Sequence, residues 1–218
     1  MSDTPASKRI PMLDPVDRVS EIVFGILMAL SFTGTLSVAA AGREQVRTLL
    51  FAALGCNLAW GLADAVMYLV RAAIERRRKV SLLRRIQAAR DPREAHQLIT
   101  DALEPLFGEH VSVPALEALH ARLASVAAPT PRLGGSDYAA AAGVFALVVL
   151  ATFPVVVPFI FISETAAALR LSNLLAVATL FVCGCALGRY AGERPWLHGM
   201  AMTAIGVALV AIVIALGG

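Results

Sequence analysis

The chain has 218 residues, of which 58% are hydrophobic, and 19 Lys and Arg against 16 Asp and Glu give it a net charge of +3. Soluble domains are about 45–50% apolar, so this composition favours a protein that sits in lipid. The apolar residues also stand in long runs instead of periodic stripes, which excludes an ordinary globular core.

Five apolar runs follow one another along the chain, and each is nearly free of charged residues. They cover residues 22–42, 48–70, 138–163, 171–188 and 195–218, and only Asp64 interrupts the second. Each reaches the ~17–25 residues that cross ~30 Å of hydrocarbon, where the backbone must be helical to satisfy its polar groups. The sequence therefore predicts an all-α polytopic membrane protein with five transmembrane helices.

These runs divide the chain into four segments. We expect a cytoplasmic N-terminal segment at 1–20, transmembrane helices 1 and 2 within 21–71, a cytoplasmic helical insert and linker at 72–137, and transmembrane helices 3 to 5 within 138–218. The insert has too little apolar surface to predict an independent core.

Local signals place helices inside the insert. Residues 72–86 continue the second helix, and their Arg and Lys suit anionic lipid head groups. Asp91, Pro92 and Glu94 are an N-cap pattern that predicts a helix to about Leu103. A further helix is expected over 113–126, followed by a Pro- and Gly-rich linker at 128–136.

The distribution of basic residues predicts the orientation, because cationic loops stay on the cytoplasmic side. With the N-terminus cytoplasmic and the C-terminus outside, sixteen Lys and Arg lie inside, and only Arg43, Arg47 and Arg170 lie outside. The basic character thus fits juxtamembrane anchoring and not nucleic-acid binding. The Ala- and Arg-rich usage favours a bacterial cytoplasmic membrane.

Asp64 is the only acid inside a predicted span, where a charge costs about 2.5–3.5 kcal/mol. Helical spacing aligns it with other polar residues in a stripe that forms a candidate transport path; the stripe consists of Asn57, Gly61, Asp64, Tyr68 and Arg71, with Met67 flanking it. A structural ion pair between Asp64 and Arg71 is the alternative.

The first span runs antiparallel to the second and aligns Glu21, Gly25 and Met28 on one face. Met28 should lie at the depth of Asp64, with Gly25 and Gly61 allowing the two helices to approach closely. A carboxylate with a thioether suits a borderline metal such as Fe²⁺ or Mn²⁺, so Asp64, Met28, Met67 and Glu21 are the candidate metal ligands. Methionine also fills gaps in apolar packing, and Glu21 is equally placed to complement a helix N-terminus.

Other residues admit a functional and a structural interpretation. Cys183 and Cys185 point to nearly opposite sides of a helix, so with Cys56 they are predicted to be packing residues and not metal ligands. His96, His110 and His120 and the neighbouring acids of the insert suit either a metal site or a solvated surface. Pro154 and Pro158 should kink the third span, as a hinge or only a bend.

Two motifs lie at the start of the chain's membrane part: Asp17-Arg-Val-Ser-Glu-Ile-Val-Phe-Gly25 before and within the first span, and Gly61-Leu-Ala-Asp-Ala-Val-Met67 in the second. Both resemble the vacuolar iron transporter family. The charged insert, the 154–159 segment and the glycine-containing last helix extend the resemblance over nearly the whole chain. The chain differs from the family where it has Met28-Ala29 instead of Asp-Gly, and Tyr68-Leu69 instead of Gly-Glu-Tyr.

The resemblance implies a homodimer of five-helix protomers that exchanges cytosolic Fe²⁺ or Mn²⁺ for protons, with the metal as substrate and no permanently bound cofactor. Asp64 and Met67 match the acid and methionine region of the family's second helix. The competing hypothesis is a membrane scaffold or sensor on the same fold, in which Asp64 would tolerate Asn. An enzyme is not expected, because the sequence has no catalytic triad, zinc motif or phosphate loop with suitable spacing.

Overall fold

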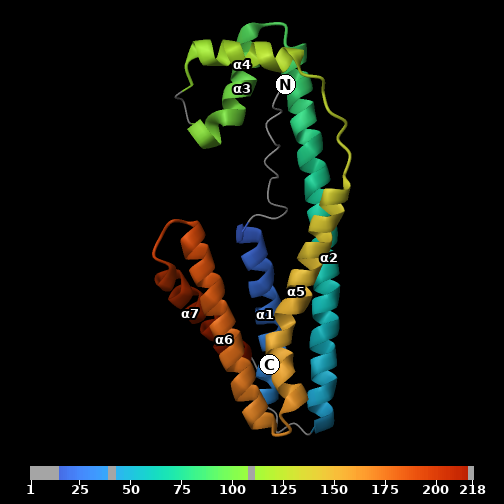
Figure 1. The fold of residues 1–218 in the computed structure, drawn as a ribbon, viewed down its shortest axis with the longest axis vertical. Helices are drawn as coiled ribbons and strands as arrows, with labels where there is room; N and C mark the ends of the chain where they lie inside the picture. The colour runs from blue at the N-terminus through green and yellow to red at the C-terminus, as the bar shows by residue number, and fades with distance from the viewer. Residues whose placement is uncertain (1–14, 39–42, 108–110, 216–218) are drawn as a thin grey trace, which may run out of the picture. The chain divides into compact units, whose positions relative to one another are not determined.

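A computed structural model describes residues 15–38, 43–107 and 111–215. This part of the chain is all-α (Figure 1). Its helices are α1 (Pro15–Val38), α2 (Arg43–Ala88), α3 (Pro92–Phe107), α4 (Val113–Ser125), α5 (Gly135–Phe161), α6 (Thr165–Tyr190) and α7 (Pro195–Ala215). They form two compact units, a bundle unit within residues 15–68 and 135–215 and an insert unit at 69–134.

The core of the bundle unit lies among α1, α5 and α6. Ile26 and Ala29 of α1, Val155 of α5 and Ala176 of α6 are fully buried in one apolar cluster. Their spacing places one apolar stripe of each helix toward the others. The first half of α2 packs against this bundle through one narrow face of the helix.

Small residues bring α6 and α7 together in a helical hairpin. Gly192, at φ 72°, closes the C-terminal end of α6, where the backbone N–H of Glu193 donates to Gly188 O at 2.9 Å. This left-handed cap is one that glycine adopts without steric cost. A Cβ on Gly184 would lie 2.8 Å from Gly199 Cα, so the two helix backbones are nearly in contact.

Three helices of the described chain are long and apolar enough to cross a membrane: α2, α5 and α6. They correspond to the second, third and fourth predicted spans, and α6 begins six residues before the predicted run at 171. The first and fifth predicted spans are helical as α1 and α7, but their crossing of a membrane stays a prediction. Residues 1–14 of the N-terminal segment, 39–42 and 216–218 lie outside the described residues.

α5 runs through both of its prolines as a continuous helix. Pro154 and Pro158 lack the backbone N–H that would donate to Leu150 O and Pro154 O. The hydroxyl of Ser172 on α6 donates to Val155 O at 2.7 Å, which fastens α6 to the segment between the two prolines. A hinge at these positions stays a prediction.

The insert unit consists of the end of α2 with α3 and α4. Asp91 Oδ1 accepts a hydrogen bond from the Arg93 N–H at 2.9 Å, so the predicted N-cap is confirmed, although α3 ends at Phe107 and not near Leu103. Ile86, Ala95, Ile99 and Leu116 form a buried cluster between the three helices. The expectation that this segment lacks enough apolar surface for a core was wrong, because seven partly buried apolar side chains extend the cluster.

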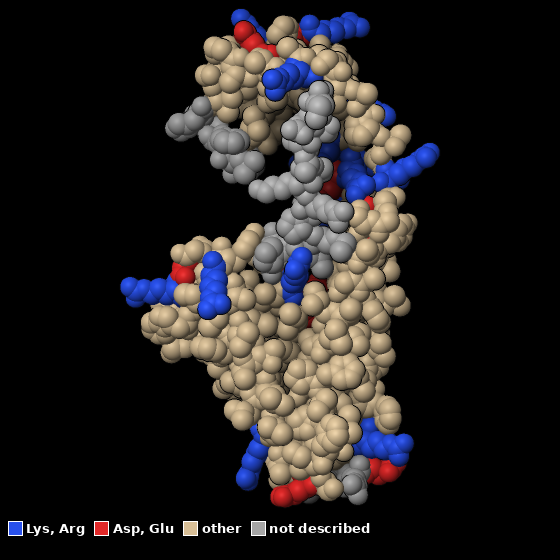
Figure 2. Space-filling view, in the orientation of Figure 1, with Lys and Arg blue, Asp and Glu red and all other residues tan. Residues whose placement is uncertain are grey.

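The flank of the bundle unit is apolar. Figure 2 shows Lys, Arg, Asp and Glu gathered at the two ends of this unit, with other residue types between them. Large apolar side chains such as Leu62, Leu174 and Val182 are each 60% exposed or more. Such a belt is stable in hydrocarbon and unfavourable in water.

Candidate functional site

Two glycines bring α1 and α2 against the same part of α5. A Cβ on Gly25 would lie 2.9 Å from Val148 O, and one on Gly61 would lie 3.3 Å from Val148 Cβ and from Phe145 O. Both glycines do lie at close helix contacts, but the nearest atoms to both belong to α5, so the predicted partner helix was wrong. The prediction had paired α1 with α2, because it considered only two of the three helices.

Asn57 joins these three helices through its amide. The residue is 1% exposed, and its Nδ2 donates to Thr152 Oγ1 of α5 at 2.6 Å and to Gly25 O of α1 at 3.3 Å. Thr152 is itself fully buried, and its hydroxyl donates to Val148 O at 3.3 Å. The helices that the glycines bring together are thus also tied by a chain of polar contacts.

The other end of this amide is unsatisfied. Asn57 Oδ1 is buried and has no hydrogen-bond partner within the residues that the structure describes. An unpaired buried acceptor costs about 1–3 kcal/mol. An amide oxygen of this kind can accept a hydrogen bond from water or coordinate a cation.

Asp64 follows on the same face of α2, seven residues or about two turns later. Its side chain is partly buried, and Oδ2 is shielded from solvent with no hydrogen-bond partner in the described part of the chain. A buried carboxylate oxygen is stabilised by a proton or by a metal cation. Asp64 is the strongest candidate for ion binding in this unit.

The remaining predicted ligands differ in how far they are buried. Glu21 and Met28 of α1 are partly buried, as is Tyr68 of α2. Met67 is 56% exposed, so it lies on the open side of α2. The structure thus brings Asn57, Gly61 and Asp64 to the packed face of α2 and leaves Met67 outside it.

No group of three or more His, Cys, Asp or Glu side chains suited to a metal ion occurs among the described residues. Cys56, Cys183 and Cys185 are free thiols, and Cys183 belongs to the apolar core of the bundle unit. In the insert unit the rings of His96 and His120 meet edge to face at 5.8 Å between centroids. His110 and Glu109 lie outside the described residues.

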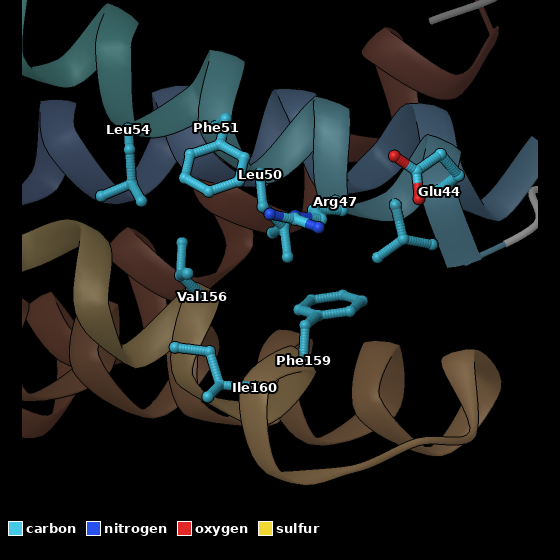
Figure 3. Close-up of a pocket in the computed structure, with 9 residues that line it drawn as sticks. Glu44, Arg47, Leu50, Phe51, Leu54, Val156, Phe159 and Ile160 are labelled. Carbon is cyan, nitrogen blue, oxygen red and sulfur yellow. The ribbon is translucent and has the colours of Figure 1, made fainter.

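A pocket of about 420 Å³ separates the N-terminal part of α2 from the C-terminal part of α5 (Figure 3). Phe51 and Leu54 of α2 face Val156 and Ile160 of α5, while Glu44 and Arg47 supply its charged groups. The Arg47 guanidinium lies 5.7 Å from the centre of the Phe51 ring. Ligand pockets usually measure about 300–1,000 Å³, so the space suffices for a hydrated ion.

The pocket lies about one helical turn from the polar junction on both helices. Asn57 comes three residues after Leu54 on α2, and Thr152 comes four residues before Val156 on α5. The hydrogen bond between Asn57 and Thr152 therefore closes the space between α2 and α5 one helical turn beyond the pocket lining. Sequence reasoning missed the pocket, because its α5 wall carries no polar residue.

The apolar flank and three long apolar helices define the chain as a multi-pass membrane protein. Comparison with known proteins does not narrow this class. No protein-family model matches the chain, and no curated protein matches its sequence.

Proposed function

We propose that the protein moves a divalent transition metal, Fe²⁺ or Mn²⁺, out of the cytosol in exchange for protons. The observation that carries the proposal is Asp64 Oδ2, a buried carboxylate oxygen without a hydrogen-bond partner in the described chain. An acid at this depth costs about 2.5–3.5 kcal/mol, and either a proton or a metal cation offsets that cost. If a proton and a metal cation compete for this one carboxylate, the movement of one can be coupled to the movement of the other.

Asn57 Oδ1 and Asp64 act in succession and not together. They are seven residues apart on α2, which is about 10 Å along the helix axis. Bonds from hard divalent cations to oxygen measure about 2.0–2.6 Å, so one ion does not contact both residues. An ion passing along α2 would meet the carboxylate of Asp64 and the amide of Asn57 as separate stations before the α2–α5 pocket.

The proposal includes five spans, with α1 and α7 added to α2, α5 and α6. α1 has 24 residues and α7 has 21, which correspond to about 36 Å and 32 Å of helix. Both lengths exceed the ~30 Å hydrocarbon core. With a cytoplasmic N-terminus in a bacterial cytoplasmic membrane, the pocket would open outside, and Asp64 would lie nearer the cytosol.

We further propose that the working form is a homodimer. Leu62, Val66 and Met67 are 50–60% exposed on the open side of α2. A second protomer against this side would bury the Met67 thioether, which lies three residues after Asp64 on α2. Met28 is the thioether available from α1 of the same protomer.

The decisive experiment is metal uptake into proteoliposomes under an imposed proton gradient. Fe²⁺, Mn²⁺, Zn²⁺ and Ca²⁺ are tested with the wild type, with Asp64→Asn, and with Asp101→Asn as a matched control on the exposed surface of α3. We expect Fe²⁺ or Mn²⁺ uptake that Asp64→Asn reduces to the level of empty liposomes and that the control retains. Asparagine keeps the shape of aspartate but loses the negative charge that binds either cation.

Two results would refute the proposal. Absence of flux for every ion with well-folded protein would favour the scaffold or sensor hypothesis. Full transport by Asp64→Asn would show that metal moves by a path that does not use this carboxylate.

A further inference from the structure

The insert unit contains a second cavity, a cleft of about 740 Å³ with a strongly basic lining. Its polar lining residues are Arg77, Ser81, Arg84, Arg85, Thr130 and Arg132. The apolar residue Val80 also lines the cleft and is buried. None of these residues has a part in the proposed transport path.

Helical periodicity creates one wall of the cleft. Arg77, Ser81 and Arg84 follow one another at spacings of four and three residues, which places them on one face of α2, with Arg85 beside them. The sequence alone shows this basic face but not what lies opposite it. The structure places Arg132 there, from the segment between α4 and α5.

Hydrogen bonds fix this second wall to α2. Arg76 donates to Arg132 O at 2.7 Å. Gln87 Nε2 donates to Leu123 O at 2.9 Å and to Val126 O at 2.8 Å, which holds the end of α4 against α2. The backbone that carries Thr130 and Arg132 is thus held in position on the helix before any ligand binds.

The lining of the cleft carries positive charge only. Four guanidinium groups line it, no Asp or Glu does, and none of the four has an ion pair within the described residues. The neighbouring cleft of the same unit, which Arg85 also lines, differs, because Glu75 and Asp101 stand there beside Arg78 and Lys79. Like charges held together repel, and an anion that enters relieves this repulsion.

We propose that this cleft binds a phosphate-bearing anion, with the Arg77, Arg84, Arg85 and Arg132 guanidiniums as its ligands and the Ser81 and Thr130 hydroxyls as further donors. Guanidinium groups bind phosphate oxygens through paired, charge-assisted hydrogen bonds. The volume exceeds that of a single phosphate, so the cleft suits a diphosphate or the phosphate head group of an anionic lipid. This inference does not depend on the proposed transport activity.

The test uses the full chain in an uncharged detergent at low salt, because salt screens exposed charges. Inorganic pyrophosphate is titrated by calorimetry into the wild type, into the double variant Arg84→Gln, Arg132→Gln, and into a matched control, Arg90→Gln, Arg122→Gln. Both double variants remove the same charge from the insert unit, but Arg90 and Arg122 do not line the cleft. Thermal unfolding of each variant checks that it is folded.

We expect the cleft variant to weaken pyrophosphate binding about tenfold or more, and the control to weaken it less than about threefold. A second titration with short-chain phosphatidylglycerol identifies the source of the phosphate. Displacement of pyrophosphate by the lipid supports a head-group site, and pyrophosphate binding that the lipid does not affect supports a soluble ligand. Equal weakening in the two variants, or no binding of either probe to the wild type, would overturn the inference.

Discussion

The close packing of α1 and α5 that positions Asn57 predicts how three glycines respond to alanine. A Cβ on Gly25 would lie 2.9 Å from the backbone oxygen of Val148, and one on Gly61 would meet Phe145 and Val148 at 3.3 Å. A Cβ on Gly55 would meet nothing within 4 Å. The same substitution therefore samples a backbone clash, a tight contact and open space.

The magnitudes follow from these distances. Overpacking destabilises the folded protein by about 1–3 kcal/mol, whereas alanine in place of a helical glycine stabilises it by about 0.5–1 kcal/mol. Gly55→Ala should therefore be neutral or stabilising. The free energy of unfolding of Gly25→Ala should be about 1–3 kcal/mol lower than that of Gly55→Ala. At ~2–4 °C per kcal/mol for a chain of this size, the two variants should differ in Tm by roughly 2–12 °C, with Gly61→Ala between them.

This order is measured by thermal unfolding of the detergent-solubilised variants, with size-exclusion chromatography as the readout. A Gly25→Ala protein that unfolds at or above the temperature of Gly55→Ala would refute the reasoning. Such a result would mean that α1 does not approach the α5 backbone as closely as the structure has it, and the polar junction at Asn57 would lose its support.

Two further predictions concern single side chains. Asn57→Leu removes both hydrogen bonds of the junction and its bare oxygen, so we expect a folded protein whose metal uptake falls by about tenfold or more; uptake equal to wild type would exclude Asn57 from the path. Asp91→Ala removes the cap of α3 at a cost of about 0.5–2 kcal/mol, which corresponds to about 2–30-fold faster amide exchange in the first turn. Unchanged exchange at Arg93 and Glu94 would contradict that role of Asp91.

The sequence predicted the helices well because their signals are local. A long apolar run has no alternative to a helix in hydrocarbon, and Asp91-Pro92 carries its own start signal. The limits of α6 were less accurate, because Thr165–Arg170 interrupts the apolar pattern without breaking the helix. The polar stripe on α2 followed from helical spacing alone.

The sequence could not predict what each face contacts. Whether Gly61 approaches α1 or α5 depends on the placement of all three helices, which no spacing within one helix specifies. For the same reason, neither the pocket next to Asn57 nor the position of Arg132 opposite the α2 arginines was predicted. The core of the insert unit was missed because its few buried residues come from three separate helices.

The two unsatisfied oxygens of α2 differ in the part they can take in exchange. The amide of Asn57 carries no net charge and does not titrate, so it cannot couple metal movement to protons, whereas a carboxylate such as that of Asp64 can bind either a proton or a metal cation. Asn57 also bonds to α1 and α5 through its Nδ2. An ion that binds its Oδ1 would therefore affect the packing of α1, α2 and α5. Under the proposed function, Asp64 therefore governs coupling and Asn57 governs passage, and their substitutions should differ in whether metal still binds without being transported.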